Sequence, residues 1–222
     1  MAVHCGLMTK TAVALREIED AVHSACRAPS FHNSQPWSWV LESTTLKLFL
    51  DPDQLVDTDS SGRQALLSCG AALDHLRVVM AARGWDILVD RFPNPNNRNH
   101  LADIEFRPSI GVTPAQRRDA EAIATRRSDR LPYDPVENLS AFEMMLRLAV
   151  EDRPTHVDLI APHDRAKVAQ ASHLAEALRM YDTAYHAELD WWTAPFGATT
   201  GIPHSSLVSA AESDRVEVGR AQ

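Results

Sequence analysis

Cysteine is scarce in this chain: Cys5, Cys26 and Cys69 are the three among 222 residues. They stand far apart, none belongs to a C-x-x-C pair, and an odd number leaves at least one thiol unpaired. This usage argues against the disulfide framework of a small secreted domain. We therefore expect a reducing compartment, and we predict a cytoplasmic protein.

Long apolar runs and runs of basic residues are also lacking. No uncharged apolar stretch approaches the ~18 residues that a membrane-spanning helix needs, and residues 1–10 lack an apolar core followed by a cleavage site. We expect neither membrane insertion nor export. The formal net charge of −8 repels a phosphate backbone, so we expect no nucleic-acid partner.

What the chain does contain is enough apolar material for a core, 45% of its residues, in segments with helical or strand periodicity. Spacings of three and four predict helices, and short alternating runs predict strands. The predicted helices are 12–27, 61–84, 113–125, one that starts at Ser140, and 164–192. The predicted strands are 37–41, 46–50, 85–92, 101–106 and 155–161.

Local signals mark where several helices begin. Three pairs have the spacing of a capping box, in which a hydroxyl and a later glutamine or glutamate satisfy free backbone N–H groups: Ser61 with Gln64, Thr113 with Gln116, and Ser140 with Glu143. Gly70 falls inside the second predicted helix, where glycine costs about 1 kcal/mol. We expect another backbone to approach closely there.

Residues 28–37, A-P-S-F-H-N-S-Q-P-W, join a helical pattern to a strand pattern. Ser30, Asn33, Ser34 and Gln35 supply hydrogen-bond donors and acceptors, and the two flanking prolines fix the backbone. Such a turn is equipped to bind a planar polar ligand. Loop statistics alone also allow a simple connection whose side chains satisfy nearby backbone groups.

Three arginines lie within five residues in the sequence R-R-S-D-R, at 126–130. Their guanidinium groups repel one another unless an anion lies among them, and a phosphate monoester suits their planar paired donors, with Ser128 adding a hydroxyl. The alternative is a solvated basic surface neutralised by Asp119, Glu121 and Asp129. Composition does not decide between the two.

The 28–37 turn resembles the A-P-S-x-x-N-x-Q-P-W signature of the FMN-dependent nitroreductases. The 126–130 segment resembles the R-x-S-x-R element that holds the ribityl phosphate of FMN in that family. By this resemblance Arg126, Arg127, Ser128 and Arg130 bind the phosphate, with Arg127 in the variable position of the motif. Ser30, Asn33, Gln35, Pro36 and Trp37 then contact the ring and ribityl portion.

Single-unit nitroreductases carry these two elements in the opposite order. A fused pseudo-dimer, with the turn from one half and the phosphate element from the other, explains the exchange. In this the chain resembles the Acg family of NAD(P)H nitroreductases, which are linked to dormancy. Residues 61–75, 91–95 and 185–192 agree with that resemblance, which covers nearly the whole chain.

The resemblance implies an α+β nitroreductase-like fold, with an antiparallel-rich sheet flanked by helices. Residues 1–112 form a first half, and residues 113–222 form a second half with a lid-like segment near 191–215. Acg proteins continue for about another hundred residues, so the second half is expected to be incomplete. We expect the face left uncovered to favour self-association.

The implied function is electron transfer from NAD(P)H through FMN to a nitroaromatic or quinone-like acceptor. Because the flavin carries the redox chemistry, no catalytic side chain is expected. Two alternatives stay open: a protein that binds or stores FMN without turnover, and an inactive truncated remnant.

Other candidate sites have weaker sequence support. His204, Ser205 and Ser206 lack the turn that a serine nucleophile uses, and the remaining histidines lack zinc-ligand spacing, so no metal is expected. Glu188 and Asp190 point to different faces of a helix, which argues against an acid/base pair. Trp191-Trp192 is interpreted as buried packing, with a lid over the flavin as the alternative. Asp59 and Arg63 could cap their helix or contact the cofactor, and capping is the simpler interpretation.

Overall fold

The structure is a computed structural model of residues 1–222, and it describes all of them except 1–11, 152–154, 195–200, 210, 213–215 and 217–222. The chain divides into two compact units. The first contains Met1–Ser128 and Glu188–His204, and the second contains Asp129–Ala187 and Ser205–Gln222. The predicted halves, 1–112 and 113–222, are defined by resemblance to nitroreductases and not by contacts within the chain. That division stays a prediction.

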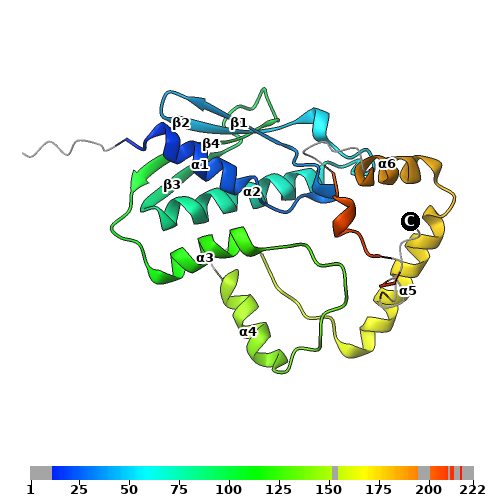
Figure 1. The fold of residues 1–222 in the computed structure, drawn as a ribbon. Helices are drawn as coiled ribbons and strands as arrows, with labels where there is room; N and C mark the ends of the chain where they lie inside the picture. Colours follow the sequence, from blue (N-terminus) through cyan, green and yellow to red (C-terminus); the bar gives the residue numbers. More distant parts are fainter. Residues whose placement is uncertain (1–11, 152–154, 195–200, 210, 213–215, 217–222) are drawn as a thin grey trace, which may run out of the picture. The chain divides into compact units, whose positions relative to one another are not determined.

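A four-stranded antiparallel sheet forms the centre of the first unit (Figure 1). Its strands are β1 (Trp37–Glu42), β2 (Thr45–Leu50), β3 (Trp85–Arg91) and β4 (His100–Pro108). They lie in the order β1-β2-β4-β3, so the first hairpin pairs with the last strand of the second. All four strands were predicted within two residues of these bounds, and with the helices they confirm the α+β class.

Two helices, α1 (Leu15–Ala25) and α2 (Arg63–Ala82), cover one face of the sheet (Figure 1). Side chains that alternate along the strands meet the apolar side of α2 in a core where Leu48, Ile104, Leu76 and Met80 are at most 1% exposed. Burial of each such side chain contributes about 1.5–3 kcal/mol. This core holds the residues before and after the 28–37 turn in fixed places.

Helix α3 (Pro114–Thr125) packs against α2 on the side away from the sheet (Figure 1). Its predicted capping box is confirmed: the N–H of Gln116 donates to the Thr113 hydroxyl at 3.2 Å, and Gln116 Oε1 accepts the N–H of Thr113 at 2.7 Å. Ile123 is its buried residue. The end of α3 thus lies against the helix that follows the turn.

The start of α2 differs from the prediction. Asp59 caps this helix by accepting the N–H of Ala65 at 2.9 Å, and the Ser61 hydroxyl bonds to Asp59 instead of forming a capping box with Gln64. A carboxylate two residues earlier reaches the free N–H groups better than the shorter hydroxyl, and its charge suits the helix N-terminus. Asp59 is therefore a capping residue, as the sequence favoured.

No other backbone approaches Gly70 closely within the described part of the chain. A Cβ placed there meets no atom within 4 Å, so our expectation is wrong for the fold as described. By length and composition α2 is also apolar enough to cross a membrane, which is weak evidence because a core helix passes the same test. Its contacts with α1, α3 and the strands account for its apolar character.

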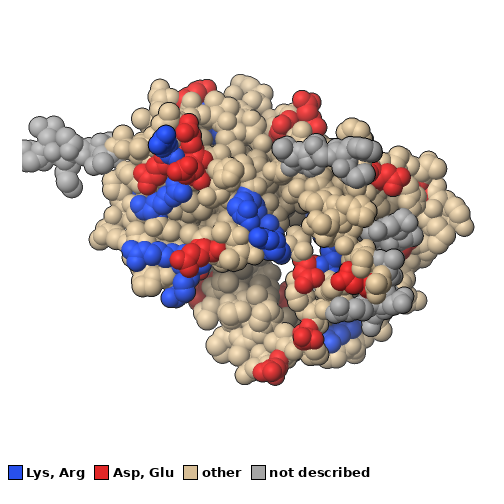
Figure 2. Space-filling view, viewed as in Figure 1, with Lys and Arg blue, Asp and Glu red and all other residues tan. Residues whose placement is uncertain are grey.

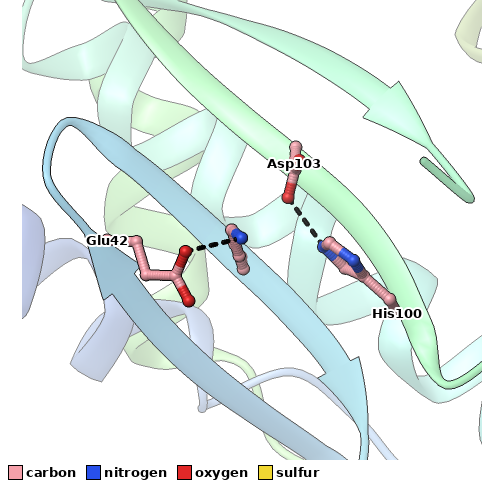
Figure 3. A network of polar contacts seen from close by, with 4 residues as sticks. Glu42, His100 and Asp103 are labelled. Carbon is pink, nitrogen blue, oxygen red and sulfur yellow. Dashed lines mark hydrogen bonds and ion pairs between the residues drawn. The ribbon is translucent and has the colours of Figure 1, made fainter. Parts of the chain in front are cut away.

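The opposite face of the sheet carries polar contacts (Figure 3). Lys47 lies between the buried Leu46 and Leu48, so alternation points it away from the core, where it bonds Glu42 at 2.7 Å. On β4, His100 Nε2 lies 2.7 Å from Asp103 Oδ1. Only one face of this sheet is therefore apolar, as in many antiparallel sheets.

The second unit contains α4 (Leu139–Ala149), α5 (Pro162–Arg179) and the start of α6 (Thr183–Thr193), which ends in the first unit. Asn138 caps α4 by accepting the N–H of Ala141 at 3.0 Å, so the predicted capping box at Ser140 is wrong. Residues 155–161 form no strand, and the predicted helix 164–192 is two helices.

Few side chains of the second unit are buried. Of its described residues, Tyr185 alone among the hydrophobic ones is buried, and Arg179 lies over its ring at 4.6 Å. Apolar side chains on α4 and α5 face solvent, among them Met144, Met145, Leu148, Leu174 and Leu178. Exposed apolar side chains that gather on one surface commonly mark an interaction site.

Candidate functional site

The 28–37 turn holds an unusual backbone. His32, Asn33 and Gln35 have φ values of 50°, 55° and 51°, in the left-handed region that non-glycine residues seldom adopt. Such residues cost about 1–3 kcal/mol each and persist where surrounding contacts enforce them, often at functional sites. Here the N–H of Gln35 donates to the Ser30 hydroxyl at 3.0 Å, which closes the turn.

Contacts from α2 fasten the turn to the core. The N–H of Phe31 donates to the Ser68 hydroxyl at 3.2 Å, and the Cys69 thiol donates to the Pro36 carbonyl at 3.1 Å. Burial raises the pKa of Cys69 to about 12, so this thiol keeps its proton. The side chains of Pro36 and Trp37 are buried, whereas Ser30, Asn33 and Gln35 are half-buried. Three polar residues of the turn thus reach its surface, whereas His32 and Ser34 are buried.

Gly201 pairs with the turn in both directions. Asn33 Nδ2 donates to the Gly201 carbonyl at 2.8 Å, and the Gly201 N–H donates to the Asn33 carbonyl at 3.1 Å. Gly201 has φ +93°, and a Cβ there would lie 3.0 Å from the Trp192 carbonyl oxygen. Only glycine fits this position without strain. The described end of the Glu188–His204 segment therefore lies on the turn.

Glu188 anchors the other end of that segment. Its carboxylate accepts hydrogen bonds from the backbone N–H groups of Asp57 and Thr58, the latter at 3.1 Å. Two adjacent amides that point at one carboxylate form a small anion-binding nest. The predicted lid-like segment, 191–215, includes residues 195–200, 210 and 213–215, which lie outside the described residues. Its parts 191–194 and 201–204 belong to the first unit, where Gly201 contacts the turn.

The arginines of the 126–130 segment donate to carbonyl oxygens. Arg126 Nη2 bonds to the Arg27 carbonyl at 2.9 Å, and Arg127 Nη1 bonds to the carbonyls of Ala124 and Arg126 at 3.1 and 2.8 Å. In the second unit, Arg130 Nη1 bonds to the Ser206 carbonyl at 2.6 Å. Ser128 is exposed.

These guanidinium charges have no carboxylate partner among the described residues. The ion pairs found there involve other side chains, so no direct ion pair joins the cluster to Asp119, Glu121 or Asp129 among the described residues. Over α1 and α3, by contrast, basic and acidic side chains lie next to one another (Figure 2). Arg126 Nε is also buried without a hydrogen-bond partner. The cluster has donor capacity to spare for an anion.

Two residues near this cluster escaped the sequence analysis. Arg27 donates from Nε and Nη2 to the Ile123 and Ala124 carbonyls at 3.3 and 2.9 Å. His75, on α2, has a pKa lowered by burial and by the charges of Arg126 and Arg27, although Asp74 opposes the shift, and its Nδ1 is buried without a partner. Residues so far apart in sequence give no local signal of their proximity.

Comparison with known proteins supports the resemblance found in the sequence. Over 214 residues the chain is 54% identical to Acg of Mycobacterium tuberculosis, which carries the name of an NAD(P)H nitroreductase; the match covers 96% of the chain and 65% of Acg. These identities confirm the predicted resemblance to the Acg group of nitroreductases. A second M. tuberculosis protein with the name of an NAD(P)H nitroreductase is 39% identical over 81% of the chain and 52% of its own length.

The chain spans just under two thirds of the length of Acg. No family model matches it. Among solved structures, a Clostridium acetobutylicum protein named as an NADH oxidase has a TM-score of 0.39 at 15% identity, over 59% of this chain and 92% of that one. A score of this size carries no argument. The Acg-type relationship rests on the sequence identity.

The weaker candidates from the sequence gain no support. His204–Ser206 is an exposed single turn, and no group of three potential metal ligands occurs among the described residues. Trp192 is buried as expected, but Trp191 is 75% exposed, so that half of the prediction is wrong. The polar turn and the arginines of the 126–130 segment are the features that fit a nitroreductase-type site.

Proposed function

We propose that this chain binds FMN and acts as an NAD(P)H-dependent oxidoreductase of nitroreductase type. One observation carries the proposal: Arg126 of the 126–130 segment donates at 2.9 Å to the carbonyl of Arg27, the residue before the 28–37 turn. Two residues 99 apart in the sequence thus meet in the first unit, one at the start of the 126–130 segment and one just before the turn. Each of these two segments resembles an FMN-contacting element of the family.

The donor set suits a phosphate monoester. Arg126 Nε is buried and lacks an acceptor, and a phosphate oxygen is the kind of anionic acceptor that a guanidinium binds most strongly. The exposed Ser128 hydroxyl lies two residues further along. Arg127 and Arg130 now donate to carbonyls and would exchange those bonds for phosphate oxygens.

The turn suits the remainder of the flavin. Ser30, Asn33 and Gln35 offer hydrogen-bonding groups at its half-buried surface, and we expect Pro36 and Trp37 to contribute through their backbone, because their side chains lie in the core. When bound, FMN would supply the redox chemistry between NAD(P)H and a nitroaromatic or quinone-like acceptor. The residues of this chain bind and orient it, so no catalytic side chain is required of them.

Flavin retention tests the proposal. The purified protein is incubated with FMN, desalted, and examined for flavin absorbance, then for NADH or NADPH oxidation with a nitroaromatic acceptor. We expect retained flavin in the wild type and its loss in an Arg126→Ala/Arg130→Ala variant. An Arg117→Ala/Arg118→Ala variant, which removes the same charge from exposed positions of α3, should retain it. A wild type that retains no FMN contradicts the proposal.

A second candidate function is FMN binding without turnover. The two-way pairing of Asn33 with Gly201 favours it, because this pairing occupies polar groups of the turn and lays the chain's own backbone over them. Bound flavin that is reduced by light but not by NADH or NADPH would support storage. Steady NAD(P)H oxidation by the flavin-loaded protein would exclude it.

Partners and location are proposals from the sequence and the exposed surfaces. The apolar side chains of α4 and α5 that face solvent favour self-association of the chain. We expect no nucleic-acid or membrane partner, and we propose a cytoplasmic location and a role in dormancy. An inactive remnant remains the outcome if the purified chain neither retains flavin nor unfolds cooperatively.

A further inference from the structure

The ends of α1 and α3 are joined by reciprocal hydrogen bonds. Arg27, just after α1, donates from Nε to the Ile123 carbonyl at 3.3 Å and from Nη2 to the Ala124 carbonyl at 2.9 Å. Arg126, just after α3, returns a bond from Nη2 to the Arg27 carbonyl at 2.9 Å. Each arginine therefore bonds to the backbone at the end of the other helix.

This joint fixes the exit direction of α3. The last four carbonyls of a helix have no partner inside it, and cations are favoured beside them. Arg27 satisfies two of the four, and the planar guanidinium makes both bonds in one orientation. Because Arg126 is the C-cap residue of α3, its backbone takes its position from this capped end.

The same joint fixes the approach to the turn. Arg27 lies directly before residues 28–37, and the bond from Arg126 holds its carbonyl. One arginine thus sets the distance between the start of the turn and the start of the 126–130 segment. Arg27 itself lies outside both resembling motifs, and its two bonds are already made to carbonyl oxygens.

We propose that Arg27 is a positioning residue for recognition of the FMN phosphate. It holds the end of α3 so that the Arg126 guanidinium points toward the phosphate, and it acts through Arg126 without contacting the flavin. This inference rests on the proposed function, because it requires that Arg126 bind the phosphate.

The test compares FMN with riboflavin, which has the same ring and ribityl chain but no phosphate. Dissociation constants are measured by quenching of flavin fluorescence for the wild type and for Arg27→Met. Loss of charged hydrogen bonds of this kind should weaken FMN binding by roughly tenfold, with riboflavin binding unchanged. General damage to the fold would weaken both ligands, so their ratio separates positioning from a structural role.

Arg83→Met is the matched control. Arg83 also joins α1 to another helix by an arginine-to-carbonyl bond, from Nη1 to the Glu17 carbonyl at 2.8 Å, but it lies at the far end of α2 from the turn. We expect this variant to keep the wild-type preference for FMN. Should Arg27→Met fail to fold, Arg27→Lys replaces it, because lysine retains the charge and one donor group. We expect Arg27→Lys to bind FMN more weakly than the wild type does and to bind riboflavin equally well.

A double variant shows whether Arg27 acts through Arg126. If it does, Arg27→Met/Arg126→Met should bind FMN no more weakly than Arg126→Met alone, whereas two independent phosphate ligands would give additive losses. Additive losses, or an Arg27→Met variant with the full FMN preference, overturn the positioning role. A wild type without preference for FMN over riboflavin overturns the phosphate site itself and the positioning role with it.

Discussion

Asn33 and Gly201 hydrogen-bond to each other in both directions, at 2.8 Å from Asn33 Nδ2 and at 3.1 Å from the Gly201 N–H. The two residues come from opposite ends of the chain, and Asn33 sits in a turn with three left-handed residues. This pairing stabilises the left-handed backbone of the turn, which is energetically unfavourable for residues other than glycine. It also occupies the side-chain amide and the carbonyl of Asn33.

The first prediction concerns Gly201→Ala. The added Cβ would lie 3.0 Å from the Trp192 carbonyl oxygen, at a φ of +93° that alanine avoids. We expect the segment to lose its pairing with the turn, at a cost of about 1 kcal/mol or more in stability. Faster hydrogen exchange at the Ile202 amide, which donates to the Trp192 carbonyl at 2.7 Å, would report the loss.

Gly70→Ala is the control for that variant. A Cβ at Gly70 meets nothing within 4 Å, and alanine is the better helix former. It should raise the free energy of unfolding by up to about 1 kcal/mol and leave exchange at Ile202 unchanged. Equal exchange in the Gly201 and Gly70 variants would contradict the role of the pairing.

The second prediction concerns Glu188→Gln. The neutral amide has one oxygen in place of two, so it binds the N–H groups of Asp57 and Thr58 less well. We expect a loss of about 1 kcal/mol in stability and faster exchange at both amides. Asp190→Asn, two residues along the same helix, is the matched control and should alter neither.

The third prediction concerns His75 and pH. Burial, followed by the charges of Arg126 and Arg27, lowers its pKa from 6.5, so the unfolded chain binds a proton more readily than the folded one. The contribution of His75 to the free energy of unfolding is therefore fully present above pH 6.5, and it is lost as the pH falls below 6.5 and through the lower pKa of the folded state. Urea unfolding of the wild type should show this decline, and His75→Gln should reduce it. An identical pH dependence in both proteins would refute the assignment.

The fourth prediction concerns the thiols of Cys26 and Cys69. Burial raises the pKa of Cys69 to about 12 and also raises that of the half-buried Cys26. Because the thiolate is the reactive form, Cys69 should resist iodoacetamide in the folded protein and react once urea unfolds it. Mass spectrometry of digested protein distinguishes the sites. Rapid labelling of native Cys69 would mean that the turn detaches from α2.

The fifth prediction concerns self-association. Leu148 is 61% exposed on α4 and lies beside Met144 in a shallow pocket that also includes Arg147 and Glu151. Leu148→Glu should shift sedimentation toward the monomer if this surface mediates contact between copies. Lys167→Glu, an exposed change of charge on α5, is the control. Monomers at every concentration of the wild type would contradict the proposal.

Sequence patterns predicted the elements whose cause is local. The periodicity of α2, the alternation of the four strands and the Thr113 capping box depend on neighbours within a few residues, and all are present. The patterns failed where two local signals compete, as at Asp59 and Ser61, or where one amphipathic run is broken, as between α5 and α6.

The contacts that shape the candidate site are not local. Arg27 and Ile123 are 96 residues apart, and Glu188 and Asp57 are 131 apart. A single arginine after a helix and a single glutamate within one are ordinary in any sequence, so nothing marks them before the core brings them together. The resemblance located the turn and the arginines, and the structure added the residues that join them.

The order of the units along the chain has a consequence for synthesis. The first unit includes Glu188–His204, but residues 129–187, which belong to the second unit, are translated before it. A ribosome therefore releases the 28–37 turn, the sheet and the arginines well before Gly201 exists to pair with Asn33. During that interval the turn lacks its Gly201 partner, so its left-handed backbone depends on the contacts with α2, from Phe31 to Ser68 and from Cys69 to Pro36.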